Sequence, residues 1–171
     1  MKIHYPNCKK IYLHGERYPE LRVAMRQVEL TPTVTKDAEG KKHYKENAPV
    51  MVYDTSGPYS DPDYTPNLKE GLPRLREEWI LKRGGVERLS EFSSSYCRER
   101  LADKSLDVLR FNHHHLPLRA LPGQPVTQMA LAKQGIVTPE MEYVAIRENM
   151  NCKELGIETH ITPEFVRDEV A

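Results

Sequence analysis

The sequence predicts an α+β fold, in which strands occupy the first third of the chain and helices dominate the last third. Short β-prone runs bounded by turn residues occur before residue 54. Two helix-start signals of the form Thr-Pro-Glu stand at 138–140 and 162–164. Thirteen prolines and nine glycines among 171 residues interrupt the chain often, so long uninterrupted helices are not expected.

Three apolar runs in the first third indicate strands. The first is Ile11–Leu13, and the second spans 23–30, where the apolar alternation breaks near Arg26. The polar stretch 31–48 then indicates a long hairpin loop. Val50–Tyr53 is apolar throughout, which predicts a strand that is covered on both faces.

The middle of the chain alternates between loops and helices. Gly-Pro and Asp-Pro pairs predict a loop over 54–63. A helix is expected from Pro73, which suits a first helical position, to the stop signal at Gly84-Gly85. A weaker helical pattern covers 96–111. The proline-rich stretch 113–125 predicts another loop, and we place a domain boundary within it.

Three helices are predicted after this loop. The first begins near Val126 and ends at Gly135. The second begins with Thr138 as its N-cap and carries two apolar stripes, which predicts that it packs on two sides. These stripes are Met141, Val144 and Ala145, and Tyr143, Ile146 and Met150. The third begins at Thr162, and no closing signal precedes Ala171, so we expect a longer protein.

The composition argues against several classes of protein. Twenty-five basic and 25 acidic residues cancel, so the chain lacks the basic excess that binding to nucleic acid needs. No run approaches the length of about 18 apolar residues that spans a membrane. The charged first twenty residues do not resemble a signal peptide, and we therefore expect a cytoplasmic protein.

The three cysteines are predicted to be free thiols. Cys8, Cys97 and Cys152 are odd in number and lie far apart in the sequence. In a reducing compartment this pattern does not indicate a disulfide framework. It also lacks the close spacing of a zinc or iron–sulfur ligand set.

Three polar clusters are candidates for chemistry. His113–His115 is a candidate metal site, but adjacent side chains diverge, and a solvated loop is the favoured interpretation. The loop Asp54–Asp63 is a candidate cation site, but it lacks calcium-loop spacing, which favours a turn. Arg147–Asn149 is either a solvated helix face or a polar contact to a neighbouring domain. No catalytic motif is present, and these residues alone do not indicate a particular reaction.

Five stretches of the chain, in order along it, resemble the phosphomethylpyrimidine synthase family, known as ThiC. They are Val52–Tyr59, Gly71–Arg76, Val126–Met129, Gly135–Asn149 (its first eight and last five residues) and Thr162–Ala171. Two features depart from the family pattern: Cys97 stands where glycine is usual, and His113–His115 replaces a more varied stretch. Neither departure affects a function that can be named.

The resemblance implies a division of the chain and a reaction. Residues 1–122 resemble the N-terminal ThiC-associated domain, and residues 123–171 resemble a helical lead-in to a (β/α)8 barrel that is absent from this chain. Family members are radical lyases of thiamine biosynthesis. They use S-adenosylmethionine, a 4Fe-4S cluster and zinc to convert aminoimidazole ribotide into 4-amino-5-hydroxymethyl-2-methylpyrimidine phosphate. The resemblance also implies a homodimer.

No catalytic, cofactor-binding or metal-binding residue is transferred to this chain by the resemblance. The family's cluster ligands form a Cys-x-x-Cys-x-x-x-x-Cys set that has no counterpart here. Its substrate-binding and metal-binding positions belong to later segments. The leading hypothesis is therefore an inactive, structural or dimerising domain whose partner is the missing barrel. The alternatives are a stand-alone binding or regulatory module, and an enzyme that uses Asp54–Asp63 and His113–His115.

Overall fold

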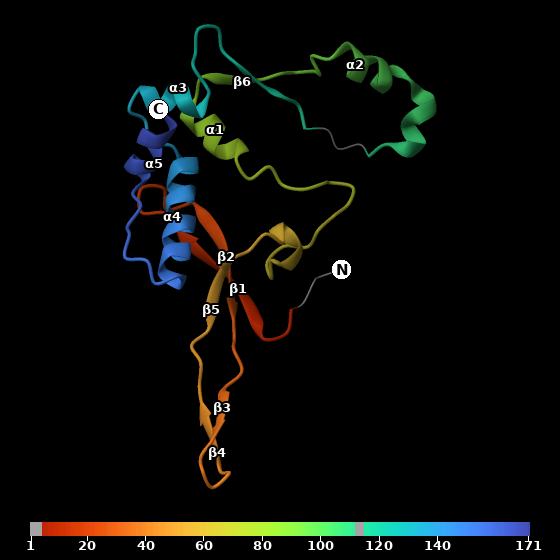
Figure 1. The fold of residues 1–171 in the computed structure, drawn as a ribbon. Coiled ribbons are helices and arrows are strands. Elements are labelled where there is room, and N and C mark those ends of the chain that lie inside the picture. Colours follow the sequence, from red (N-terminus) through yellow and green to blue (C-terminus); the bar gives the residue numbers. More distant parts are fainter. Residues whose placement is uncertain (1–4, 112–114) are drawn as a thin grey trace. The chain divides into compact units, whose positions relative to one another are not determined.

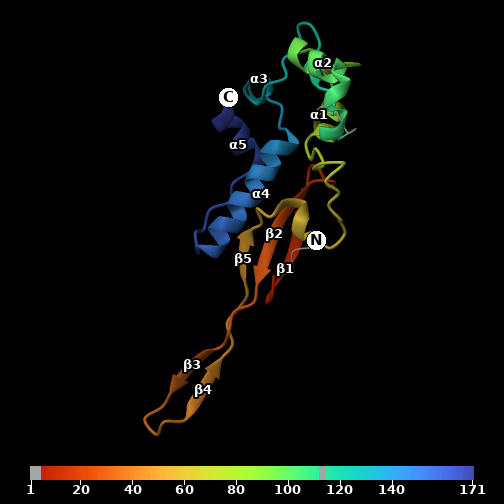
Figure 2. The same ribbon diagram turned by 90° about the vertical axis from the view of Figure 1, so that its right-hand side faces the viewer.

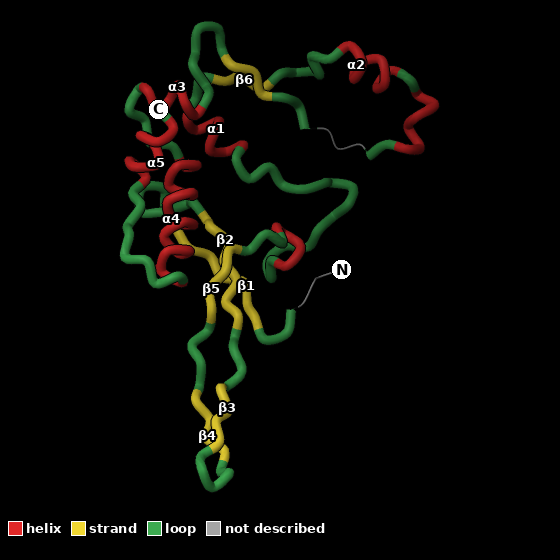
Figure 3. The backbone as a smooth tube through the Cα atoms, in the orientation of Figure 1, coloured by secondary structure: helices red, strands yellow, loops and turns green. Residues whose placement is uncertain are grey.

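A computed structural model describes residues 5–111 and 115–171 (Figures 1 and 3). Strands and helices are both present, which confirms the α+β class, and the described residues form no barrel. The chain divides into two compact units. The first combines the residues up to Thr65 with Val137–Glu169, and the second combines Pro66–Ile136 with Val170–Ala171.

An antiparallel sheet of three strands forms the centre of the first unit. Its order is β1 (Cys8–His14), β2 (Arg22–Val28) and β5 (Val50–Tyr53), so that β2 is the central strand. All three strands were predicted. The prediction that β5 is covered on both faces is wrong, because Val52 is 44% exposed. As an edge strand that pairs only with β2, β5 leaves part of its surface open.

The helix α4 (Pro139–Glu154) packs on β2 and β5 and forms the core of this unit with the sheet. Alternation along the strands sends Val23 and Met25 to the same face, where both are fully buried. Met141 and Ala145 of α4, both 2% exposed, complete this core. Two members of the first predicted stripe of α4 are thus buried in this core, and Tyr143 of the second stripe bonds the hydroxyl of Tyr53 on β5 at 2.9 Å.

A buried carboxylate joins α4 to the turn between β1 and β2. Glu142 is 3% exposed, and its Oε1 accepts hydrogen bonds from the backbone N–H groups of Glu16 at 2.8 Å and Arg17 at 2.9 Å. Its Oε2 accepts the N–H of Tyr18 at 2.9 Å. A Cβ on Gly15 would lie 2.5 Å from this Oε2, so the turn requires glycine at that position.

Thr138 caps α4 as predicted, since its side chain accepts a hydrogen bond from the backbone of Met141. The next helix, α5 (Pro163–Val170), follows a connection that Asn149 holds in place. The Asn149 amide donates to the carbonyl of Ile161 at 2.8 Å and accepts the Ile161 N–H at 2.7 Å. The polar end of α4 therefore has an internal structural role.

The stretch between β2 and β5 forms a two-stranded hairpin, which we call the arm. Its strands are β3 (Thr33–Lys36) and β4 (Lys42–Lys45), and all eight residues are exposed. The sequence predicted a hairpin here but no strands. Local hydrogen bonds hold both ends of the arm. At its turn, the carboxylate of Asp37 accepts the backbone N–H of Lys41. At its base, the Asn47 amide donates to the carbonyl of Thr31.

The second unit contains short helices and a two-stranded ladder. Its helices are α1 (Glu77–Arg83), α2 (Ser95–Ala102) and α3 (Gln128–Lys133), and its strands are β6 (Val86–Arg88) and β7 (Leu118–Ala120). The start and end of α3 were predicted within two residues. The β6–β7 ladder was missed, because β7 lies in the stretch predicted as a loop.

Two predicted helices of this unit are corrected by the structure. The helix expected from Pro73 begins only at Glu77, because Arg74 donates to the carbonyls of His115 and Leu116 and so holds the preceding segment outside the helix. Its predicted end at Gly84 is confirmed by the left-handed φ of 80°. The single helix expected over 96–111 is divided at Asp103, whose carboxylate caps a following 3₁₀ helix, η2 (Lys104–Leu109).

The division at residues 122 and 123 stays a prediction. It concerns the domains of a longer family member, whereas the compact units of this structure change at Pro66 and Val137.

Replacing Glu142 by glutamine should destabilise the first unit, because the amide nitrogen of glutamine cannot accept the backbone N–H groups that now meet a carboxylate. We expect a loss of roughly 1–3 kcal/mol in the free energy of unfolding, measured by urea denaturation. The matched control is Glu154→Gln on the same helix, where the side chain is exposed and the change should stay within about 0.5 kcal/mol. Equal effects of the two changes would contradict the role given to Glu142.

Candidate functional site

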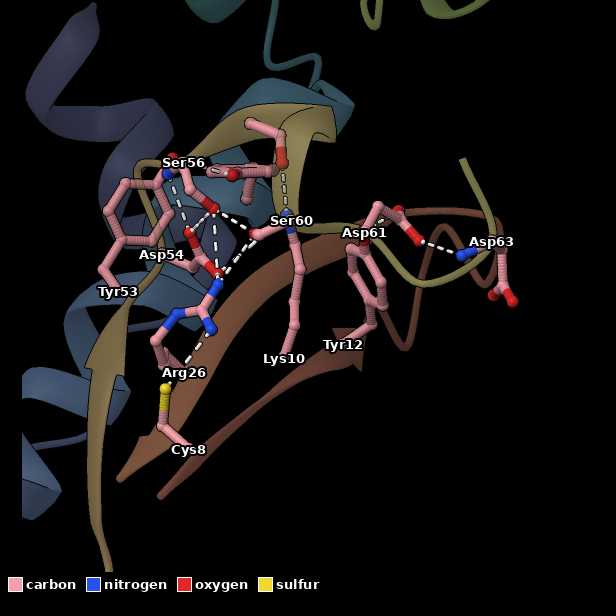
Figure 4. Close-up of polar contacts among 12 residues, drawn as sticks. Cys8, Lys10, Tyr12, Arg26, Tyr53, Asp54, Ser56, Ser60, Asp61 and Asp63 are labelled. Atoms are coloured by element: carbon pink, nitrogen blue, oxygen red, sulfur yellow. Dashed lines mark hydrogen bonds and ion pairs between the residues drawn. The ribbon is translucent and has the colours of Figure 1, made fainter. Parts of the chain in front are cut away.

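The most concentrated polar cluster lies on the sheet face opposite α4 (Figure 4). The strand register places Lys10 directly beside Arg26, and Tyr12 follows two residues along β1 on the same face. The segment after β5 supplies the remaining members, Asp54 and the residues up to Asp61. Because strand alternation sends the apolar residues to α4, these polar side chains share the other face.

Arg26 is the centre of the cluster. Its Nη2 donates to Oδ2 of Asp54 at 2.5 Å and to Oγ of Ser60 at 2.7 Å, and its Nη1 donates to Sγ of Cys8 at 3.4 Å. The guanidinium also lies over the ring of Tyr5, 4.5 Å from its centroid. One side chain from the central strand therefore contacts groups from two other segments, residues 5–8 and the loop after β5.

Asp54 is almost completely buried, and its carboxylate is surrounded by donors. Its Oδ1 accepts the backbone N–H of Ser56 at 2.7 Å and also the Ser56 hydroxyl. Its Oδ2 bonds Arg26 and lies 3.9 Å from Nζ of Lys10. Burial alone would raise the pKa of Asp54, but the Ser56 bonds and the two nearby cations lower it more, so the pKa lies below its usual range.

A second carboxylate in the same loop bonds a tyrosine. The hydroxyl of Tyr12 donates to Oδ2 of Asp61, while Oδ1 of Asp61 accepts the backbone N–H of Asp63 at 3.0 Å. Burial and this hydrogen bond raise the pKa of Tyr12. Arg22 lies over the Tyr12 ring, 3.8 Å from its centroid. Together with the Arg26–Asp54 bond, the Tyr12–Asp61 bond attaches the loop to both β1 and β2.

The loop itself is a turn, as the sequence predicted. It contains a 3₁₀ helix, η1 (Gly57–Ser60), whose end is closed by the bond from the Asp61 N–H to the carbonyl of Pro58 at 3.1 Å. Lys10 donates to the carbonyl of Gly57. The three aspartates of the loop do not gather around one point, because Asp54 bonds Arg26, Asp61 bonds Tyr12, and Asp63 is exposed.

The contacts of this cluster suit a structural role better than a catalytic one. Both oxygens of Asp54 already accept hydrogen bonds, and a carboxylate with a lowered pKa is a weak proton acceptor near neutral pH. Its protein donors would have to be displaced before it could bind a cation. The arrangement instead fixes the loop to the sheet.

The other sequence candidates take different places. His113 and His114 lie outside the described residues, while the carbonyl of His115 accepts a bond from Arg74 at 3.1 Å. Arg147 bonds its neighbour Glu148 and lies 5.6 Å from the ring centroid of Tyr53. The alternative of a contact to a neighbouring domain stays a prediction.

Sequence reasoning missed Arg26, Lys10 and Glu142 as organising residues. The break in apolar alternation at Arg26 was the available signal, since a cation within a strand needs a partner when it is covered. Nothing comparable marks Glu142, because an acidic residue in the first turn of a helix is ordinary.

The described residues do not fit a four-iron cluster. Over 5–111 and 115–171, no group of three or more His, Cys, Asp or Glu side chains is placed to hold a metal ion. Cys8, Cys97 and Cys152 are free and lie on β1, α2 and α4. Such a cluster needs several thiolates grouped together. Within the described ranges, no helix is both long and apolar enough to cross a membrane.

Residues 4–87 match the family model of the ThiC-associated domain. This stretch is a ThiC-associated domain. The match contains the three-stranded sheet, the arm, the Asp54 cluster and α1. It confirms the resemblance to the N-terminal part of the ThiC family, which belongs to thiamine biosynthesis. The polar cluster thus lies within the matched residues.

Replacing Asp54 by asparagine should destabilise the ThiC-associated domain by about 3 kcal/mol or more, because Arg26 would remain mostly buried without its anion. Thermal or urea unfolding of the whole chain measures this loss. Asp63→Asn is the matched control, since Asp63 is exposed in the same loop and the change should be nearly neutral.

The contribution of Asp54 should also depend on pH. Its pKa is lower in the folded chain than the ordinary value of about 3.9, so the unfolded chain binds the proton more readily. The stabilisation is therefore full above about pH 4 and is lost as the pH falls further. We expect the difference in unfolding free energy between the natural chain and Asp54→Asn to shrink below pH 4. A difference that is constant from pH 7 to pH 3 would contradict this pKa direction.

Proposed function

We propose that this chain is the N-terminal, non-catalytic part of a phosphomethylpyrimidine synthase. The full enzyme would convert aminoimidazole ribotide into 4-amino-5-hydroxymethyl-2-methylpyrimidine phosphate by S-adenosylmethionine radical chemistry, in the cytoplasm. The observation that carries the proposal is the match of residues 4–87 to the ThiC-associated domain. A (β/α)8 barrel of the same protein would be its partner.

The role proposed for the chain is structural and dimerising. The polar groups of its principal cluster are engaged with one another, which supports a scaffold whose loops are fixed before any partner docks. The arm and one face of α5 remain exposed, and such surfaces suit contacts with other chains or domains.

In this proposal, the cofactors bind to another part of the full-length enzyme. In the full-length enzyme, a 4Fe-4S cluster would supply the reductive cleavage of S-adenosylmethionine. The described residues lack the donor set for it, and the same holds for zinc. The contribution of this chain would be the placement and support of the barrel.

The isolated chain should bind no iron–sulfur cluster and form no product. After anaerobic reconstitution we expect no absorption band near roughly 400 nm and far less than about four irons per chain. With aminoimidazole ribotide, S-adenosylmethionine and a reductant, 5′-deoxyadenosine should stay at the level of a control without protein. A full-length synthase, assayed in parallel, serves as the positive control. Reductant-dependent 5′-deoxyadenosine from the chain alone would overturn the proposal.

The regulatory alternative is distinguished by the gene sequence. If the chain is a covalent part of a synthase, the reading frame should continue after the codon for Ala171 into a barrel and a cysteine cluster. A stop codon directly after Ala171 would instead favour a stand-alone module.

A further inference from the structure

The arm presents a mixed apolar and basic face that has no partner among the residues that the structure describes. In the β3–β4 register, Val34 stands opposite Tyr44 and Lys36 stands opposite Lys42. Strand alternation places these two pairs on the same face. Val34 is 49% exposed and Tyr44 is 65% exposed. An isolated two-stranded hairpin is only marginally stable in water, so an arm with uncovered apolar residues calls for a docking partner.

The lysine pair indicates the charge of that partner. Like charges that stand directly opposite each other destabilise a strand pair. Among the described residues, neither Lys36 nor Lys42 forms an ion pair with a carboxylate. An acidic surface that docks on this face would relieve the repulsion. Nucleic acid is disfavoured as the source of this charge, because the chain has no net basic excess.

A complementary surface exists on α5 of the same chain. The exposed residues within this helix are Phe165, Asp168 and Glu169, and the spacing i, i+3, i+4 places them on one face. Phe165 is 54% exposed. Asp168 already forms an ion pair with Arg167 beside it, whereas Glu169 forms no ion pair with any residue that the structure describes. An apolar side chain beside carboxylates thus mirrors the apolar pair beside lysines on the arm.

The distance between the apolar and charged side chains is similar on the two surfaces. On the arm, consecutive pairs on one face are roughly 7 Å apart along the strand. On the helix, side chains at i and i+4 are about 5–6 Å apart. An aromatic contact between Phe165 and the Val34–Tyr44 pair would therefore bring Glu169 close to Lys42.

The two surfaces do not meet within one chain. The arm and α5 lie at opposite ends of the first unit in both views (Figures 1 and 2). We infer that the arm of one chain docks on α5 of a second copy, and that the arm of the second copy docks on α5 of the first. This reciprocal exchange closes around a twofold axis and makes two equivalent contacts in each dimer. It specifies the interface of the dimerising role proposed above and rests on that role.

Sedimentation equilibrium of the full chain tests this pairing. We expect a monomer–dimer equilibrium at concentrations from about 1 µM to about 1 mM. The dimer Kd should rise as salt is added, because salt screens the ion pairs between the two copies. Lys42→Glu should raise the dimer Kd roughly tenfold or more, since each dimer contains the altered contact twice. The matched control is Lys45→Glu, which changes the opposite face of the same strand and should leave the Kd within about twofold.

Mixing two variants separates lost docking from lost folding. Glu169→Lys should weaken the dimer as Lys42→Glu does, and a lysine in the last turn suits the helix dipole. In an equimolar mixture of the two single variants, both contacts of the heterodimer again join opposite charges. The mixture should therefore form a heterodimer with a Kd near that of the natural chain, and so should a chain that carries both changes.

Several outcomes would overturn the pairing: a natural chain that stays monomeric throughout, a Lys45→Glu effect equal to that of Lys42→Glu, or a mixture that stays monomeric. A dimer insensitive to Lys42→Glu would exclude this interface and leave the non-catalytic role untouched. Formation of 5′-deoxyadenosine would exclude that role and leave the pairing untouched. The two proposals therefore fail in different measurements.

Discussion

The ion pair between Arg26 and Asp54 is the constraint on which much of the first unit depends. A carboxylate that is almost completely buried loses its hydration and needs charged or hydrogen-bonding partners in return. Asp54 obtains them from the central strand and from its own loop, so the loop has little freedom to leave the sheet. The desolvation of one side chain thereby decides how the loop after β5 lies on the sheet.

The sheet has two faces with different chemistry. One face packs apolar side chains against α4, where Glu142 adds hydrogen bonds to the turn between β1 and β2. The other face is covered by a loop held through ion pairs, hydroxyl groups and a tyrosine. The arm and the outer side of α5 are among the surfaces that remain open. A domain of this kind is suited to making contacts at its ends.

Local sequence signals predicted those elements whose cause is local. The N-cap at Thr138, the glycine that ends α1 and the Gly-Pro turn after β5 each depend on a few neighbouring residues. The predictions that failed concern partners distant in the sequence. Arg74 delays the start of α1 through bonds to residues more than forty positions away, and β7 becomes a strand because β6 is available to pair with it.

The sequence by itself determined the α+β class, the approximate strands and helices, and the resemblance to the ThiC family, because repeated apolar spacing and long motif strings are visible along the chain. The tertiary structure alone decided that Arg26 joins Asp54, that Glu142 binds the turn at Gly15, and that the arm projects with both faces exposed. The physical reason is that burial and charge pairing depend on which segments come into contact in the folded chain. The spacing of residues along the sequence does not specify contacts between distant segments.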